Sequence, residues 1–296
     1  MSLGGVIASL VTPYSGYGGI DTDGVGRLVE HAIAGGVQGV LVNGPVGEAP
    51  HLSRGERIFV IEAAIEAAAG RVPVYAGTGA VGTEETLALT WDAGKAGVAA
   101  AFVATPFYYP LPQAALLDHY RHLTRRGRLP LVAVSDPAAI GNALDPATLA
   151  ELATVEGIAG VALADSDPAP LPATLALIGD RAPVLAARDS LLLPALTAGA
   201  TGCISRLAGL SPGAVVALAR AMREGDKAGA ATQCARLQPL IRLLDDPATG
   251  VAACKAAAMA LGLPGSAPRS PLPGASDELR EAVARAVAGA GLETGG

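Results

Sequence analysis

The chain has 296 residues and a mass of 29.3 kDa, a length that a single α/β barrel accommodates. Hydrophobic residues make up 51% and charged residues 16% of the sequence, so a large core is available and intrinsic disorder is excluded. The formal net charge is −6 and no stretch is strongly basic, which argues against nucleic acid as the main partner.

Short apolar runs of strand length recur along most of the chain. They are rich in Val and Ala and apolar on both faces, as the strands of a parallel sheet covered by helices are. Amphipathic segments of helical length separate them, and eight such units predict a (β/α)₈ TIM barrel of the α/β class. The expected strands cover residues 6–11, 37–42, 72–76, 100–104, 129–134, 158–162, 183–187 and 202–204.

Several of the intervening helices have readable ends. Ser53 and Glu56 match a capping box, which predicts a helix that begins there and ends near Gly70. Asp145-Pro146 and Ser211-Pro212 each combine an N-cap residue with a proline suited to the first helical position.

From about residue 226 the strand pattern stops. Three further helices are expected over residues 226–244, 249–261 and 276–290, with a Pro-, Gly- and Ser-rich linker over 262–275. We therefore predict a barrel over residues 1–225 and a C-terminal helical extension over 226–296 that packs on it. The middle helix is expected to lie on the outer side of the barrel wall.

The sequence also bears on the protein's location. The longest uncharged run, residues 97–117, contains three prolines and does not predict a membrane-spanning helix, despite a mean hydropathy of +0.42. No Lys or Arg precedes the first apolar stretch, so we expect no signal peptide. Three widely spaced cysteines without metal-ligand spacing are typical of a reducing compartment, and we predict a cytoplasmic protein that does not bind membranes.

Active sites of such barrels lie at the C-terminal ends of the strands. An ordered set of segments there runs from about Gly5 to Leu263: Leu10-Val11-Thr12-Pro13, Gly44-x-x-Gly47-Glu48, Val74-Tyr75-Ala76-Gly77-Thr78-Gly79, Thr105-Pro106-Phe107-Tyr108-Tyr109, Leu196-x-x-Gly199-x-x-Gly202-x-Ile204-Ser205, and Lys255 with Leu261-Gly262-Leu263. In these segments the chain resembles the dihydrodipicolinate synthase/N-acetylneuraminate lyase family of class I aldolases. The resemblance implies a barrel with additional C-terminal helices and a lyase or aldolase acting on pyruvate-like keto acids or sugar acids.

The same comparison implies departures at the positions that carry the family's chemistry. Ala162 takes the position of the Schiff-base lysine, and Val134 that of the tyrosine that relays protons. The basic residue that holds an acid substrate corresponds to Ala139. The hydroxyl pair of the second-strand loop becomes Pro45 and Val46.

Imine formation needs a primary amine that can lose its proton in a desolvated pocket. The chain has only three lysines, and alanine at position 162 offers no nucleophile. We expect Lys95 and Lys227 to be solvated and Lys255 to have a structural role. Val134, Pro45 and Val46 also lack the hydroxyls of a proton relay. We predict that the standard aldolase activity is lost or altered.

Other family positions are unchanged: Gly47, Glu48, Tyr108 and Ile204. In the family, the tyrosine at position 108 reaches across a subunit interface. Its neighbours here are apolar and aromatic, so we expect a homo-oligomer, either a tetramer or a dimer.

Polar residues remain at the strand ends, among them Glu48, Asp136, Asp165, Arg188 and Asp189. One interpretation is an acid-lined pocket for a cation, a polyol or an amine. The other is that these groups cap loops around a vestigial site. Arg188 either holds a substrate or pairs with Asp165 or Asp189 and closes the pocket.

Three functions therefore stay open. The first is a lyase with altered chemistry, using Glu48, Asp165 or Tyr108 for acid–base catalysis. The second is a non-catalytic barrel that binds a small ligand, such as a keto acid or sugar acid, or a partner subunit. The third is a metal-assisted enzyme in which the mouth carboxylates hold Mg²⁺ or Mn²⁺. The Gly77-x-Gly79 segment lacks the third glycine of a dinucleotide fingerprint, and we predict no cofactor.

Overall fold

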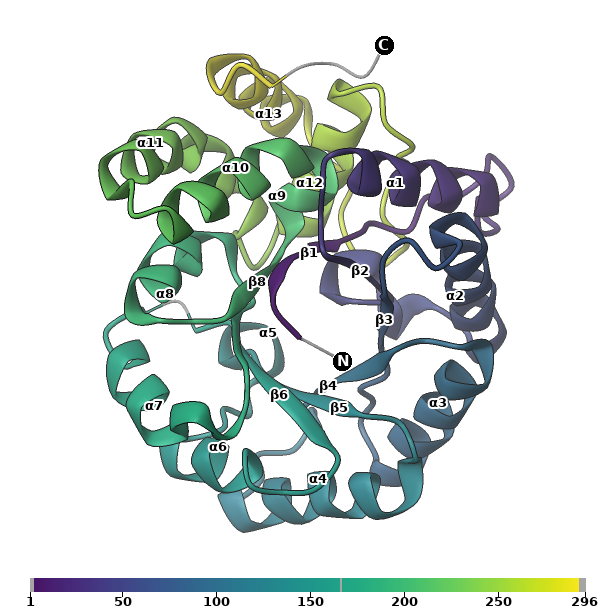
Figure 1. Ribbon diagram of the computed structural model, residues 1–296. Helices are drawn as coiled ribbons and strands as arrows, with labels where there is room; N and C mark the ends of the chain where they lie inside the picture. Colours follow the sequence, from purple (N-terminus) through teal and green to yellow (C-terminus); the bar gives the residue numbers. More distant parts are fainter. Residues whose placement is uncertain (1–2, 166, 293–296) are drawn as a thin grey trace.

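A computed structural model describes residues 3–165 and 167–292 and contains a closed barrel of parallel strands (Figure 1). Neighbouring strands pair in chain order, and β8 closes the barrel by pairing with β1. The predicted TIM barrel is confirmed. Its strands are β1 (Gly5–Ser9), β2 (Gly39–Val42), β3 (Val74–Gly77), β4 (Ala100–Ala104), β5 (Leu131–Ser135), β6 (Ile158–Leu163), β7 (Val184–Ala186) and β8 (Gly202–Ser205).

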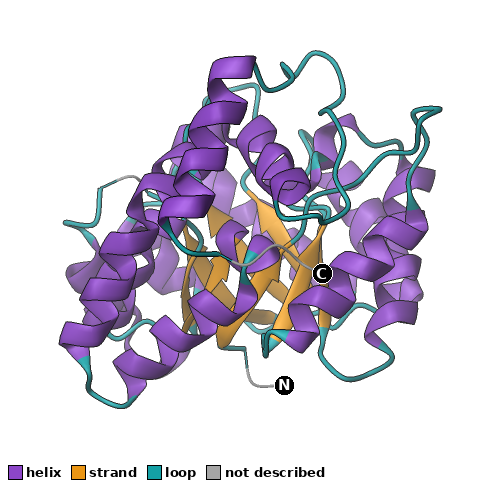
Figure 2. Ribbon diagram, turned by 90° about the horizontal axis from the view of Figure 1, so that it is seen from above, coloured by secondary structure: helices purple, strands orange, loops and turns teal. Residues whose placement is uncertain are grey.

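Helices enclose the strands on the outside (Figure 2). Those of the barrel are α1 (Thr22–Ala34), α2 (Arg54–Ala68), α3 (Thr83–Ala96), α4 (Gln113–Gly127), α5 (Pro137–Ile140), α6 (Pro146–Leu152), α7 (Leu171–Ile178), α8 (Leu192–Ala198), α9 (Arg206–Leu210) and α10 (Pro212–Arg223). Short 3₁₀ helices are η1 (Pro45–Gly47), η2 (Ala49–His51), η3 (Gly179–Arg181) and η4 (Asp189–Leu191).

The expected helix ends are present. Ser53 accepts a hydrogen bond from the Glu56 amide, and the Glu56 side chain accepts one from the Ser53 amide, as a capping box requires. Asp145 caps α6 through the Thr148 amide. Helix α10 begins at Pro212 as expected, although the Ser211 side chain makes no capping hydrogen bond.

Strand side chains alternate between the barrel interior and the surrounding helices. Inside, Phe102 packs edge-on against Tyr75, with Leu41, Val132 and Ala162 in the same buried cluster. These side chains fill the interior of the barrel up to the C-terminal ends of the strands. We refer to this end of the barrel as the mouth.

Three helices follow the barrel where the sequence predicted them: α11 (Lys227–Leu244), α12 (Gly250–Ala260) and α13 (Asp277–Gly289). Helix α11 packs against α9 and α10, α12 packs against α9, and α13 packs against α11 and α12 (Figure 1). No helix in the described ranges is both long and apolar enough to cross a bilayer.

The extension makes contacts that the sequence did not predict. Helix α12 lies outside the ring of strands, but its residues Gly250 and Val251 line the cavity at the mouth and it contacts η1 (Figure 1). The segment 262–275 has no regular structure, as predicted, but it is not a free linker. Its Arg269 donates hydrogen bonds to Glu56, to the His51 carbonyl at 3.1 Å and to the Gly18 carbonyl at 2.8 Å.

Candidate functional site

A cavity of about 340 Å³ opens at the mouth of the barrel. Its wall comes from residues at or just after the strands, including Ser9, Val134, Ala187 and Ile204, and from the C-terminal extension. A cavity of this size falls within the range that holds small-molecule ligands, at its lower end. The location is the one where barrels of this type carry their active sites.

Most of the wall is apolar. Leu41, Phe102 and Val134 contribute side chains from the barrel interior, and Pro45 and Val46 from the loop after β2. Ala162 is fully buried in the interior cluster, where it pairs in register with Val134 and Leu185, and it does not line the cavity. Residue 162 therefore contributes only a buried methyl group to the interior cluster.

Arg188 lines the cavity at the end of β7. Its Nη2 donates to the Asp245 carbonyl at 2.6 Å and its Nη1 to the Ala164 carbonyl at 3.3 Å, while Nε lies 3.7 Å from Asp245 Oδ2. One of the two alternatives for Arg188 was a pairing with Asp165 or Asp189, but its carboxylate partner is Asp245 of the C-terminal extension. The cavity nevertheless stays open.

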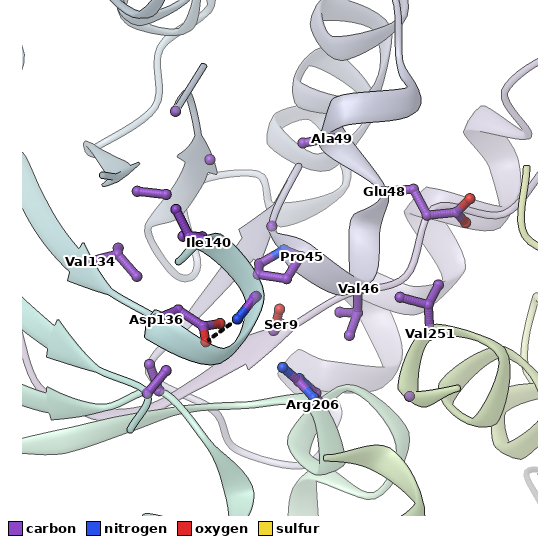
Figure 3. Close-up of a pocket in the computed structure, with 18 of the residues that line it drawn as sticks. Ser9, Pro45, Val46, Glu48, Ala49, Val134, Asp136, Ile140, Arg206 and Val251 are labelled. Atoms are coloured by element: carbon purple, nitrogen blue, oxygen red, sulfur yellow. Dashed lines mark hydrogen bonds between the residues drawn. The ribbon is translucent and has the colours of Figure 1, made fainter. Parts of the chain in front are cut away.

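Arg206 follows β8 and also lines the cavity (Figure 3). Its Nη1 donates to the Leu244 carbonyl at 2.7 Å and lies 3.5 Å from Asp245 Oδ1. Asp245 therefore contacts both guanidinium groups, and its Oδ2 also accepts from the Ser190 amide at 2.8 Å. The carboxylate ties the extension to the ends of β7 and β8.

Asp136 is a buried carboxyl on the cavity wall and caps the short helix α5 through the Ala139 amide at 3.2 Å (Figure 3). Burial raises its pKa above the usual range, against the opposing effects of that hydrogen bond and of the charges on Arg206 and Arg188. A carboxyl that readily holds a proton can donate as well as accept hydrogen bonds.

Asp189 has a structural role beneath the wall. It is fully buried, accepts from the Ser205 hydroxyl, and accepts from the Arg206 and Leu207 amides at 3.1 and 3.2 Å. Burial, followed by the charge of Asp245, raises the pKa of Asp189 to about 6. This carboxyl fixes the start of α9 and does not line the cavity.

Glu48 borders the cavity, but its carboxylate is turned away from it (Figure 3). The carboxylate forms a buried ion pair with Lys255 of α12 and accepts from the Arg269 amide at 2.7 Å. Lys255 Nζ also lies 4.0 Å from the centre of the Tyr14 ring. Lys255 does not line the cavity, whereas Lys95 and Lys227 are exposed as expected.

Three other candidates lie outside the cavity wall. Gly47 packs behind it, where its carbonyl accepts from the Thr12 hydroxyl at 2.8 Å. Asp165 is partly buried at the end of β6, and its pKa is raised mainly by burial. Tyr108 is 80% exposed and has a φ of 91°, in the left-handed region. Of the carboxylates considered for an acid-lined pocket, Asp136 lines the cavity, whereas Glu48 is turned to Lys255. Asp165 and Asp189 do not line it. The other acidic residues on the wall, Asp245 and Asp246, come from the extension.

The structure thus brings together Pro45, Val46, Val134, Asp136, Ala139, Arg188 and Ile204 around one cavity, with Glu48 at its edge. Sequence reasoning missed Arg206 and Asp245. Arg206 comes two residues after a predicted strand, which was the available signal, but nothing in the sequence connects Asp245 to it. Among the described residues, no three His, Cys, Asp or Glu side chains are grouped as metal ligands.

A family model described as the dihydrodipicolinate synthetase family matches residues 2–290. The chain belongs to this family. A curated member, the 4-hydroxy-tetrahydrodipicolinate synthase of Xanthomonas axonopodis pv. citri, is 40% identical over 237 residues, which cover 80% of this chain and 78% of the relative.

Two further members cover almost the whole chain. An uncharacterized DapA-like lyase of Halobacterium salinarum is 34% identical over 292 residues, 99% of this chain and 95% of the relative. The chloride-inhibited dihydrodipicolinate synthase of Acinetobacter baumannii, solved in complex with pyruvate, superposes with a TM-score of 0.92 at 30% identity. The match covers 98% of this chain and 100% of that one. The dihydrodipicolinate synthetase family therefore accounts for both the barrel and the extension.

Proposed function

We propose that this protein binds a small keto acid or sugar acid at the barrel mouth and does not process it through an imine. One observation carries the proposal: the cavity contains two arginines and a largely apolar wall, while none of the chain's three lysines lines it. Guanidinium groups bind carboxylates well but stay protonated, so they cannot supply the nucleophile of a Schiff base.

The composition of the wall supports this proposal. Val134, Pro45 and Val46 present no hydroxyl to the cavity, and Ala162 presents no amine. A relay that moves a proton between a bound ligand and its surroundings needs groups that exchange protons. In contrast, binding needs only a shaped apolar surface and a few polar groups, which the cavity has.

Borohydride trapping tests the absence of an imine. The protein is incubated with pyruvate and sodium borohydride, and its intact mass is measured. We expect no mass gain, because reduction fixes only an imine formed on an amine. A gain located at any of the three lysines would overturn the proposal. A family member that carries the lysine serves as the positive control.

A second candidate function is a lyase that uses acid–base chemistry without an imine. The observation that favours it is Asp136, a titratable carboxyl on the cavity wall with a raised pKa. Turnover of a keto acid or sugar acid that is abolished in Asp136→Asn would establish it. Binding of such acids without turnover favours the non-catalytic function instead.

We also propose a cytoplasmic homo-oligomer. The adjacent side chains of Tyr108 and Tyr109 are 80% and 66% exposed and contact each other edge-on, which leaves an aromatic surface uncovered on the isolated chain. Light scattering at micromolar concentration tests the assembly: a dimer or tetramer is expected, and a monomer contradicts it.

A further inference from the structure

The wall of the cavity is divided into an apolar part and a polar part. By the family resemblance, the basic residue that holds an acid substrate lies at position 139, and a hydroxyl pair lies in the second-strand loop. Pro45, Val46 and Ala139 occupy these positions, and all three line the cavity. None of their side chains has a hydrogen-bond donor, so this part of the wall suits the apolar portion of a ligand and not its charge.

The guanidinium groups of Arg188 and Arg206 lie instead at the ends of β7 and β8. They differ in how many of their nitrogens already contact oxygen atoms of the protein. All three nitrogens of Arg188 face protein oxygens: the Ala164 carbonyl and the carbonyl and carboxylate of Asp245. Arg206 uses only Nη1. Within residues 3–165 and 167–292, its Nη2 and Nε have no hydrogen-bond partner. The side chain is 16% exposed and borders the cavity, so two donors of a fixed fork remain for a ligand.

The charges around Arg206 leave room for a further anion. Two guanidinium groups share the carboxylate of Asp245. The carboxyl of Asp189 is turned to the Ser205 hydroxyl and to backbone amides. Asp246, which also borders the cavity, accepts hydrogen bonds from the Ala248 and Thr249 amides. Burial raises the pKa of Asp136, against the lowering effect of the nearby Arg206 charge, so this carboxyl readily holds a proton (Figure 3). A planar guanidinium with two unused donors binds a carboxylate by two parallel hydrogen bonds.

Two more polar groups border the same space. The Ser9 side chain, at the end of β1, and the carboxyl of Asp136 both line the cavity (Figure 3). A hydroxyl donates to a keto oxygen or accepts from a hydroxyl, and a protonated carboxyl does the same. They suit an oxygen on the carbon next to the ligand's acid group.

We propose that Arg206 binds the carboxylate of a small 2-oxo or 2-hydroxy acid, whose short apolar chain lies against Pro45 and Val46. This inference rests on the proposed function and adds a residue and an orientation to it. Arg206 acts in it as a specificity-determining residue for acids over neutral ligands. Its backbone and Nη1 contacts hold the side chain in place, so that little freedom is lost when a ligand binds.

The test uses the full chain and matched pairs of probes. Pyruvate, lactate, 4-methyl-2-oxopentanoate and 2-hydroxy-4-methylpentanoate are titrated by calorimetry, each beside its primary amide. The variants are Arg206→Gln and Arg206→Lys, and Arg125→Gln serves as the control that removes one exposed positive charge on α4. Thermal melts verify that each variant is folded. If Arg206→Gln does not fold, Arg206→Lys still tests the inference, because it keeps the positive charge but lacks the two-pronged guanidinium group.

We expect at least one acid to bind the unaltered chain more tightly than its amide does. The affinity of Arg125→Gln for that acid should equal the affinity of the unaltered chain. Affinity for the acid should fall roughly tenfold or more in Arg206→Gln, and less in Arg206→Lys, with little change for the amide. Acid binding that is unchanged in both Arg206 variants overturns the inference and leaves the proposed function standing. Tighter binding of the amides also overturns the inference alone, whereas binding of no probe overturns both.

Discussion

Lys255 and Glu48 form an ion pair in which the two side chains are 1% and 0% exposed. The residues are far apart in the chain, one on α12 and the other between η1 and η2. Removing water from both charges is costly, and only their mutual attraction and the surrounding hydrogen bonds offset that cost. The pair therefore holds the extension against the barrel mouth as a matched unit.

Breaking this pair from one side should destabilise the protein strongly. Lys255→Met leaves the Glu48 carboxylate buried without its partner, and we expect the free energy of unfolding to fall by about 3–5 kcal/mol. The double variant Lys255→Met/Glu48→Gln removes both charges and should recover much of the loss. Urea unfolding of the three proteins measures it. Equal losses in the single and double variants would show that the charges are not coupled.

Introducing an amine at position 162 should not by itself give aldolase activity. Ala162→Lys places a nucleophile beneath the cavity, but its neighbour Val134 and the loop residues Pro45 and Val46 still lack hydroxyls to relay protons. We expect no pyruvate-dependent turnover in this variant. Recovery of turnover in the single variant would show that the relay matters less than the lysine.

Neutralising Asp136 should strengthen the binding of an acid. Its carboxyl faces the cavity, and its pKa is raised by burial, so an anionic ligand binds best while Asp136 holds a proton. Affinity of the unaltered chain should fall as the pH rises and this proton is lost. Asp136→Asn is uncharged at every pH and still suits the N-cap of α5. The affinity of Asp136→Asn for the acid should therefore not change with pH, which calorimetry at pH 5 to 8 would measure. If the affinities of the variant and of the unaltered chain change with pH in the same way, the prediction is contradicted.

Asp189 should make the free energy of unfolding fall as the pH rises. A salt-bridged carboxylate has the opposite effect. Its pKa is raised to about 6 in the folded chain, above the value of about 3.9 for an unfolded aspartate. Between these values the folded state binds a proton that the unfolded state lacks. The stabilising contribution is therefore complete below about pH 4 and is lost as the pH rises through about 6.

The measurement compares the unaltered chain with Asp189→Asn at pH 4.5 and pH 7.5. The amide cannot ionise, so its stability deficit should be larger at the lower pH. Asp180→Asn, a change at an exposed aspartate, is the control and should show no such trend. A deficit for Asp189→Asn that is equal at both pH values would contradict the assignment.

The sequence predicts the elements of this fold well because local patterns determine them. The capping box at Ser53 marks the start of α2, and the apolar run at residues 100–104 is β4. Contacts between distant segments are what local patterns do not encode. Arg188 was a candidate from its place after a strand, but its partner Asp245 lies 57 residues further along. Glu48 was a candidate from its motif, yet Lys255 turns its carboxylate away from the cavity.

The position of the extension affects how ligand preference can be redesigned. Asp245, Gly250, Val251 and Leu272 lie outside every strand of the barrel, yet they line the same cavity as the strand ends. Mutant libraries confined to residues 246–251 and 270–274 would reshape that boundary without disturbing the strand pairing or the contacts of Asp245 with Arg188 and Arg206. Chimeras that join this barrel to the C-terminal helices of a homologue would change the ligand preference while the barrel stays the same.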